Sequence, residues 1–342
     1  MLQNLVRKNI QNLKAYSSAR DEFTGSEGIF LDANENPFGT LNRYPDSHQK
    51  ELKSALSDLK NVPTKNIFIG NGSDEIIDLL FRVFCNPGQD KALTFLPTYG
   101  MYDVSAGIND VELLTISLDE NFQIDVEKTA PFLEKEEIKL IFICSPNNPT
   151  GNVLNAENIR FLLDNFSGIV VIDEAYIDFS ETTSWVEMIE KHPNLVVSQT
   201  FSKAWGLAAA RVGVAYAKEE IIYYLNKVKP PYNVSQLNQA AALKALKNRE
   251  QFEQNVVIIL KEKQRLIDAF SKMKSVKKIY PSDANFILIE VENAPDLYEK
   301  LVVEKVIVRN RHSLVKNALR ITVGTAEENE KLIETLKNLA DS

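Results

Sequence analysis

Residues 200–211, TFSKAWGLAAAR, contain a lysine among small and apolar residues, just after a run that is typical of a buried strand. A lysine whose ammonium group is desolvated can form a Schiff base with a carbonyl cofactor. Lys203 can equally be a strand-end side chain whose stem packs while its charge stays in water. The segment alone leaves both interpretations open.

A second candidate is acidic. Asp173 ends the apolar run GIVVID, where a carboxylate is unfavourable unless it meets a cation or hydrogen-bond donors. It can be a helix N-cap or part of a buried structural ion pair. It can also keep a nearby ring nitrogen protonated, because an opposite charge favours the charged form of that nitrogen.

Two turns carry groups that bind anions or polar rings. GNGSDE, residues 70–75, has Glu75 where a dinucleotide fingerprint requires its third glycine, so that motif is absent. The remaining turn is either a plain capped helix start or a set of free amides that binds an anion. SPNNPTG, residues 145–151, is either an ordinary turn or a rigid loop that presents Asn147 and Asn148 to a ligand.

Pyridoxal phosphate accounts for these four motifs together. The cofactor requires a Schiff-base lysine, an acid for its pyridine nitrogen, a phosphate cup and a partner for its ring. Thr200, Ser202 and Arg211 flank Lys203 and add hydroxyls and a cation that suit a phosphate. We therefore predict a pyridoxal-phosphate site.

The elements that must position this site follow from periodicity. Between about residues 66 and 218, seven short apolar runs alternate with helical segments, which predicts an α/β fold with a mostly parallel sheet between helices. In such a sheet the ligand binds beyond the carboxyl ends of the strands.

The pattern changes after residue 218. A long helical stretch precedes ANFILIEV, KVIVRN and ALRITVG, which predict three strands of a smaller α+β unit. The last helix should begin with a capping box at Thr325 and Glu328. Because Pro230 and Pro231 cannot continue a helix, we predict a large domain over 41–229 and a small C-terminal domain over 230–342. Residues 1–40 are expected to form an N-terminal arm that joins the small domain.

The ordered set GNGSDE, PTYGMY, SPNNPTG, VIDEAYIDF, TFSKAWGLAAAR and LRITVG resembles the fold-type I pyridoxal-phosphate-dependent aminotransferases of class II. YSSAR, LDANENP and NRYP make the chain most similar to the histidinol-phosphate aminotransferase family. The resemblance implies a large domain with a seven-stranded sheet. It also implies amino transfer between L-histidinol phosphate and 2-oxoglutarate, giving imidazole-acetol phosphate and L-glutamate, in histidine biosynthesis.

The same resemblance implies a role for each matching residue. Lys203 matches the lysine that forms the Schiff base and then acts as general base, and Asp173 matches the partner of the pyridine nitrogen. Tyr176 and Asn148 match the hydrogen-bond partners of the ring oxygen, and Tyr99 matches the aromatic that stacks on the ring. The catalytic residues are then Lys203, Asp173 and Tyr176. The full implied cofactor-binding set is Tyr44, Gly72, Ser73, Asp74, Tyr99, Asn148, Asp173, Tyr176, Thr200, Ser202, Lys203 and Arg211.

Substrate and subunit contacts are implied in the same way. Tyr44 resembles a tyrosine that reaches the cofactor phosphate across a dimer interface, which implies a homodimer with shared active sites. Arg309 and Arg320 are expected to hold a substrate phosphate or carboxylate through paired hydrogen bonds, although a surface salt bridge also explains Arg309. The implied substrate-binding set is Tyr16, Asn34, Arg309 and Arg320, and the extra Arg311 leaves the separate roles of the arginines undecided.

Composition narrows the classes of function. The chain has 342 residues, a net charge of -8 and no block of basic residues, which disfavours nucleic acid and anionic membranes as partners. Two distant cysteines indicate a reducing compartment, and three histidines without ligand spacing indicate no metal site. The amphipathic N-terminus and the lack of a long apolar run favour a cytoplasmic protein.

Three alternatives remain open at this point. Two share the fold, namely an aromatic-amino-acid aminotransferase and a phosphothreonine decarboxylase. The third is a non-enzymatic pyridoxal-phosphate-binding regulator, which the acidic charge disfavours because such proteins bind DNA. Trp205 is expected to pack in the core rather than to act in the site.

Overall fold

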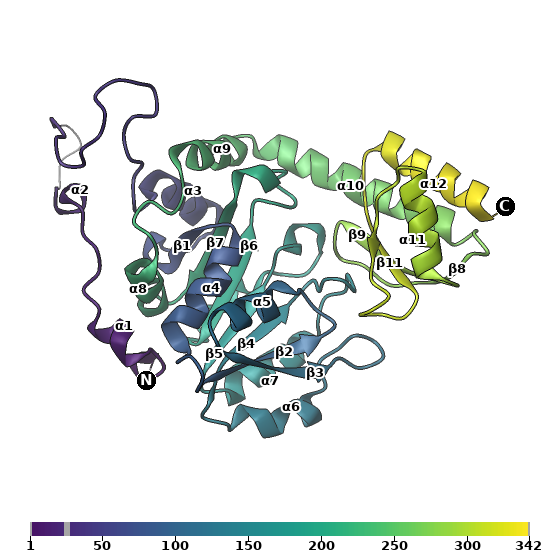
Figure 1. Cartoon of the computed structure of the whole chain (residues 1–342), viewed down its shortest axis with the longest axis horizontal. Coiled ribbons are helices and arrows are strands. Elements are labelled where there is room, and N and C mark those ends of the chain that lie inside the picture. The colour runs from purple at the N-terminus through teal and green to yellow at the C-terminus, as the bar shows by residue number, and fades with distance from the viewer. Residues whose placement is uncertain (1, 24–27, 341–342) are drawn as a thin grey trace.

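Seven strands form the central sheet in the computed structural model, which describes residues 2–23 and 28–340 (Figure 1). Their order across the sheet is β1-β7-β6-β5-β4-β2-β3, and only β7 runs antiparallel to its neighbours. The prediction of a mostly parallel seven-stranded sheet is therefore confirmed. The strands are β1 (Ile67–Asn71), β2 (Lys91–Leu96), β3 (Glu112–Ser117), β4 (Ile138–Cys144), β5 (Ile169–Asp173), β6 (Leu195–Thr200) and β7 (Val212–Ala217).

Helices cover both faces of this sheet, and the strands are apolar on both sides for that reason. In β5, Val170 and Ile172 belong to the apolar cluster on one face, and Ile169 and Val171 belong to the cluster on the other. The first face packs against α3 (Lys50–Lys60), α6 (Val126–Leu133), α7 (Ala156–Asn165) and α9 (Gln236–Lys247). The second packs against α1 (Lys8–Asn12), α4 (Ser73–Phe84), α5 (Met101–Ile108) and α8 (Glu219–Val228).

A second, four-stranded antiparallel sheet has the order β10-β11-β9-β8. Its strands are β8 (Val276–Ile279), β9 (Phe286–Val291), β10 (Arg309–Asn310) and β11 (Ala318–Thr322), and its helices are α11 (Ala294–Val303) and α12 (Ala326–Ala340). The capping box at the start of α12 is confirmed. The Thr325 amide donates to Glu328 Oε2 at 2.8 Å, and the Glu328 amide donates to Thr325 Oγ1 at 3.2 Å.

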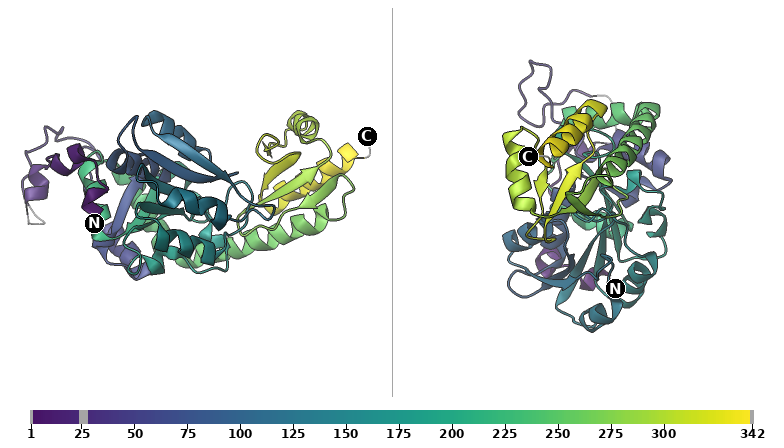
Figure 2. Two further views of the ribbon diagram at one scale, coloured as in Figure 1. Left: turned by 90° about the horizontal axis from the view of Figure 1, so that it is seen from below. Right: turned by 90° about the vertical axis from the view of Figure 1, so that its right-hand side faces the viewer.

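Helix α10 (Arg249–Phe270) connects the two sheets as a rod of 22 residues, about 33 Å long (Figures 1 and 2). It follows α9 with a break at Asn248, so the long helical stretch of the sequence forms two helices. Trp205 stacks on Phe252 of α10 with ring centroids 3.9 Å apart, which confirms its expected packing role.

The N-terminal residues pack against helices that cover the seven-stranded sheet. Val6 and Ile10 pack in the same cluster as α4 and α8, and the Arg7 amide donates to Val83 O at 3.0 Å. The following segment, which includes α2 (Ala19–Glu22), extends from the body at the end opposite the four-stranded sheet (Figures 1 and 2). The domain limits stay a prediction, and residues 1, 24–27 and 341–342 of the predicted arm and small domain lie outside the described residues.

The described part of the chain also contains five short 3₁₀ helices: Leu2–Asn4, Thr64–Asn66, Ile177–Phe179, Trp185–Met188 and Ala208–Ala210. No helix among residues 2–23 and 28–340 combines the length and apolar character that crossing a bilayer requires. Both cysteines, Cys85 and Cys144, are free and buried. No cluster of three or more potential metal ligands occurs within the described ranges.

Candidate active site

A pocket lies where β1, β4, β5 and β6 end, at the carboxyl edge of the parallel strands. Because β7 runs antiparallel and starts at Val212, Arg211 reaches the same edge as the loop after β6 that carries Lys203. The pocket is lined by Ser73, Asp74, Tyr99, Cys144, Asn148, Asp173, Ala175, Tyr176, Thr200, Ser202, Lys203, Ala208 and Arg211. The structure therefore brings together ten of the twelve residues predicted to bind the cofactor, Tyr44 and Gly72 being the two that do not line this pocket.

Lys203 stands at the pocket with its side chain accessible from the opening. Its Nζ lies 5.6 Å from the centre of the Tyr176 ring. Surrounding protein desolvates the ammonium and, with the nearby charge of Arg320, lowers the pKa of Lys203. A lysine of this kind provides a larger share of neutral, nucleophilic amine near neutral pH than a solvated lysine does.

Asp173 lies at the floor of the pocket with 4% of its surface exposed. Tyr102 donates its hydroxyl to Oδ2 at 2.9 Å, and the Ala175 amide donates to Oδ1 at 3.1 Å. Burial raises the pKa of Asp173 to about 6 in spite of these two donors. The charge of Lys203 offsets the burial of this carboxylate only in part, and a protonated ring nitrogen would supply a further cation.

The anion end of the pocket is built around the N-terminus of α4. Gly72 has φ +79, and a Cβ there would lie 2.5 Å from Arg211 Nη2. On the other side, a Cβ at Gly213 would lie 2.4 Å from both Gly72 C and Ser73 N. Only glycines at these two positions leave the turn free to direct its amides, with the positive end of the α4 dipole, toward an anion.

Side chains complete this anion end. Arg211 Nη1 lies 3.5 Å from Ser202 Oγ, which also accepts from Thr200 Oγ1 at 3.0 Å. Arg211 Nη2 donates to Asp74 Oδ2 at 3.2 Å. Two hydroxyls and a guanidinium at a helix N-terminus form a donor set that suits a phosphate dianion.

The opposite side of the pocket offers partners for a ring and its oxygen. Asn148 Nδ2 donates to the Tyr176 hydroxyl at 3.4 Å, and Arg320 Nη1 donates to Asn148 Oδ1. Tyr99 donates its hydroxyl to Asp74 Oδ1 at 3.1 Å, which fixes its ring at the pocket wall. These residues fit pyridoxal phosphate, since phosphate donors, ring-oxygen partners, a buried acid and an amine occur in one pocket.

Three arginines lie on one face of the β10–β11 ribbon. Arg309 is directly opposite Arg320 in the antiparallel register, and Arg311 follows Arg309 by two residues, so all three side chains leave the same face. Burial and the charges of Arg320 and Arg309 lower the pKa of Arg311 to about 10. Arg311 Nε and Arg320 Nε are buried without a hydrogen-bond partner.

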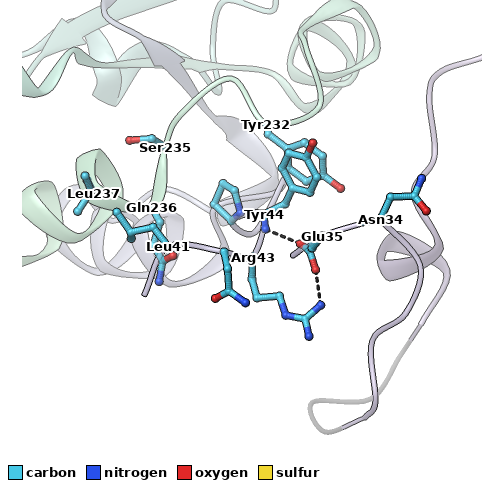
Figure 3. Close-up of a pocket in the computed structure, with 12 residues that line it drawn as sticks. Asn34, Glu35, Leu41, Arg43, Tyr44, Tyr232, Ser235, Gln236 and Leu237 are labelled. Carbon is cyan, nitrogen blue, oxygen red and sulfur yellow. Dashed lines mark hydrogen bonds and ion pairs between the residues drawn. The ribbon is translucent and has the colours of Figure 1, made fainter. Parts of the chain in front are cut away.

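The predicted N-terminal site residues lie elsewhere. Tyr44 stacks on Tyr232 with centroids 4.4 Å apart, in a separate hollow that Asn34 also lines (Figure 3). Glu35 holds this region by accepting from the Tyr44 amide and from Arg43, both at 2.6 Å. Tyr16 is exposed on the extended segment. Within this single chain, these three predicted residues do not meet the pocket.

Two buried residues near Asp173, namely Tyr102 and Glu174, have structural roles that the sequence did not predict. Tyr102 belongs to the PTYGMY motif, but nothing in its spacing indicates a hydrogen bond to Asp173, which is 71 residues away. Glu174 accepts from Ser184 Oγ at 2.5 Å, from the Trp185 amide at 2.7 Å and from Gln199 Nε2 at 2.8 Å. It thereby anchors the turn that follows Asp173. The only local signal was a second acid after an apolar strand.

Comparisons with known proteins agree with this geometry. The chain is 51% identical to a histidinol-phosphate aminotransferase of Cytophaga hutchinsonii, over 98% of each chain. The crystal structure of the histidinol-phosphate aminotransferase from Clostridium acetobutylicum matches with a TM-score of 0.81 and 26% identity, covering 88% of this chain and 91% of that one. The enzyme from Sinorhizobium meliloti, solved in complex with pyridoxal-5'-phosphate, shares the fold at 22% identity, with a TM-score of 0.79 over 90% of each chain.

These comparisons confirm the predicted fold and the prediction that the chain is a transaminase. The family model for aminotransferase class I and II matches residues 19–336, which include both sheets and the whole pocket. The chain belongs to the class I and II aminotransferase family.

Proposed function

We propose that this enzyme transfers the amino group of L-histidinol phosphate to 2-oxoglutarate in histidine biosynthesis. The observation that carries the proposal is the set of three arginines on one face of the β10–β11 ribbon, next to a pocket that fits pyridoxal phosphate. The name of the relative that is 51% identical along nearly its whole length supports the same substrate.

The arginine face is suited to a doubly charged substrate group. Tyr176, which lines the pocket, interacts electrostatically with both Arg311 and Arg320. Three like charges on one ribbon repel each other, and burial lowers the pKa of Arg320 as well. A phosphate monoester carries more charge than a carboxylate and offers three acceptor oxygens, so it compensates such a cluster better.

The chain's own residues can carry out the proton transfers. Pyridoxal phosphate, when bound, supplies an electron sink for the substrate carbon that bears the amine. Lys203 Nζ, with its lowered pKa, removes the proton from that carbon and returns it on the product side. Asp173 would pair with the protonated ring nitrogen, and Arg211 with Ser202 would hold the phosphate end, which would keep the reacting carbon within reach of Lys203.

A panel of amino donors tests the substrate. Histidinol phosphate, phenylalanine, tyrosine and phosphothreonine are each supplied with 2-oxoglutarate, and glutamate formation is measured. We expect kcat/KM to be highest for histidinol phosphate. Equal or faster turnover of the aromatic amino acids would favour the aromatic aminotransferase. Release of carbon dioxide from phosphothreonine without a keto acid would favour the decarboxylase.

We also propose that the enzyme is a cytoplasmic homodimer whose subunits share active sites. Tyr44 lies outside its own pocket, and the segment around it exposes apolar side chains: Ile29 is 91%, Leu31 87% and Phe38 81% exposed. Surfaces of this kind mark contacts with another chain. Two free cysteines agree with a reducing compartment.

Mixing two inactive variants tests the shared site. Lys203→Ala and Tyr44→Ala chains are unfolded together and refolded as a mixture. If Tyr44 acts on the partner's pocket, each mixed dimer has one complete site, and about a quarter of the wild-type activity returns for random pairing. If Tyr44 acts within its own chain, no mixed dimer has a complete site and activity stays absent.

A further inference from the structure

The hydroxyl of Tyr102 is buried beneath the pocket, where it cannot touch substrate. We infer that Tyr102 is a positioning residue, which orients Asp173 and keeps it ionised for the ring nitrogen of the cofactor. The inference rests on the cofactor site alone and not on the identity of the amino donor.

The contacts leave little freedom to either side chain. Tyr102 is completely buried in α5, and its hydroxyl donates to Asp173 Oδ2 at 2.9 Å. Its ring stacks on Phe142 with centroids 5.0 Å apart and meets Tyr99 edge-on at 5.7 Å. Since the Ala175 amide holds Oδ1, each carboxylate oxygen has one fixed donor from the protein. The carboxylate therefore presents its remaining lone pairs in one orientation.

Tyr102 also opposes the effect of burial on its partner. Desolvation raises the pKa of Asp173, and the Tyr102 hydrogen bond is the largest of the contributions that lower it. The other groups that act on this carboxylate are the Ala175 amide and Lys203, which lower its pKa, and Asp74, which raises it. Neutral Tyr99, Tyr176 and Cys144 also face the site, and the pKa of each is raised by burial.

Removing the hydroxyl therefore has a defined direction. In Tyr102→Phe the ring still fills its space between Phe142 and Tyr99, but Asp173 loses its strongest donor. The pKa of Asp173 then rises above 6, and a larger fraction of this group is protonated near neutral pH. A protonated Asp173 is no anionic partner for the ring nitrogen, so the cofactor binds less tightly and needs a higher pH to bind.

The test measures cofactor binding to the cofactor-free dialysed protein, by tryptophan fluorescence, from pH 6 to pH 9. Tyr102→Phe should weaken the affinity about fivefold at pH 6, about twofold at pH 7 and hardly at pH 9, because losing a hydrogen bond to a charged group changes the protonation equilibrium of Asp173 about tenfold. Tyr224→Phe is the matched control, since Tyr224 is a buried tyrosine of the same apolar cluster outside the pocket. An affinity loss that is equal at every pH would overturn the inference, because it would indicate a packing defect only.

A double-mutant cycle with Asp173→Asn keeps the inference testable if Tyr102→Phe is also less stable. In the Asp173→Asn background there is no carboxylate left to position, so adding Tyr102→Phe should change cofactor affinity less than twofold. A fivefold loss at pH 6 in both backgrounds would mean that Tyr102 acts independently of Asp173, and the assignment would then be wrong.

Discussion

Replacing Asp173 with asparagine should make the cofactor-free protein more stable above pH 6 while it weakens cofactor binding. The ordinary pKa of this group is 3.8, and burial raises it to about 6 in the folded chain. Below pH 3.8 the carboxyl group is protonated in both states and carries no penalty. As the pH rises from 3.8 through 6, the folded state loses stability relative to the unfolded state, since it must accept a buried charge that Lys203 offsets only in part.

The magnitude follows from linkage. The difference between 3.8 and about 6 corresponds to about 3 kcal/mol once both states are ionised. Between pH 4.5 and pH 8 the change is about 2 kcal/mol, because the unfolded chain is already largely ionised at pH 4.5. The free energy of unfolding of Asp173→Asn should therefore rise by that amount relative to the wild type across this interval.

The assay is urea unfolding of the cofactor-free proteins at one fixed protein concentration, followed by circular dichroism. Asp103→Asn, the same change at an exposed position on α5, is the control and should show no such trend. Saturating cofactor should reverse the order, since only the wild type offers the ring nitrogen an anion. A wild-type-to-variant difference that stays constant from pH 4.5 to pH 8 would refute the reasoning.

Three further predictions concern the lysine, the glycine turn and the extended segment. Lys203→Ala should fold normally but lose both the turnover and the visible absorbance of the cofactor-loaded enzyme. A variant that keeps both would show that Lys203 is not the Schiff-base residue. Gly213→Ala should lose about 1 to 3 kcal/mol of stability and much of its cofactor affinity, because its Cβ would lie 2.4 Å from the backbone of Gly72. The control Gly107→Ala should be close to neutral, because a Cβ at Gly107 would have no atom within 4 Å. Glu35→Gln should speed limited proteolysis of the N-terminal segment at pH 7, because hydrogen bonds from two arginines lower the pKa of Glu35 to about 2. The stabilising effect of these bonds is fully present above the ordinary pKa of 4.5 and is lost as the pH falls toward 2. Equal cleavage rates for the two proteins would contradict this prediction.

The fold was predictable wherever consecutive buried positions carry apolar residues. All five residues of β5 and all six of β6 are buried, and the apolar runs IVVI and LVV at their starts mark them in the sequence. The reversed direction of β7 was not predictable, because VGVAYA has the same pattern as its parallel neighbours. β8 was missed because its sequence, VKKI, exposes two lysines and forms no apolar run. The predicted strand KVIVRN shortened to Arg309–Asn310.

The pocket was predictable to the extent that its residues sit at strand ends. Motifs that end parallel strands must meet at one edge, so Asp173 and Lys203 converge for topological reasons. Tyr102 could not be predicted, since its bond depends on how α5 packs over β4 and β5. Tyr44 lies outside the pocket of its own chain, and its predicted contact with the pocket of a second chain stays a prediction.

Both cysteines are buried, so we expect them to react slowly with thiol reagents. Desolvation raises the pKa of Cys85 and of Cys144, so neither forms appreciable thiolate at ordinary pH. A cysteine introduced at the exposed position of Phe38 would then be the one thiol that a maleimide dye labels. The wild-type sequence thus provides a background for labelling the extended N-terminal segment, and the label would report on the proposed contact between subunits.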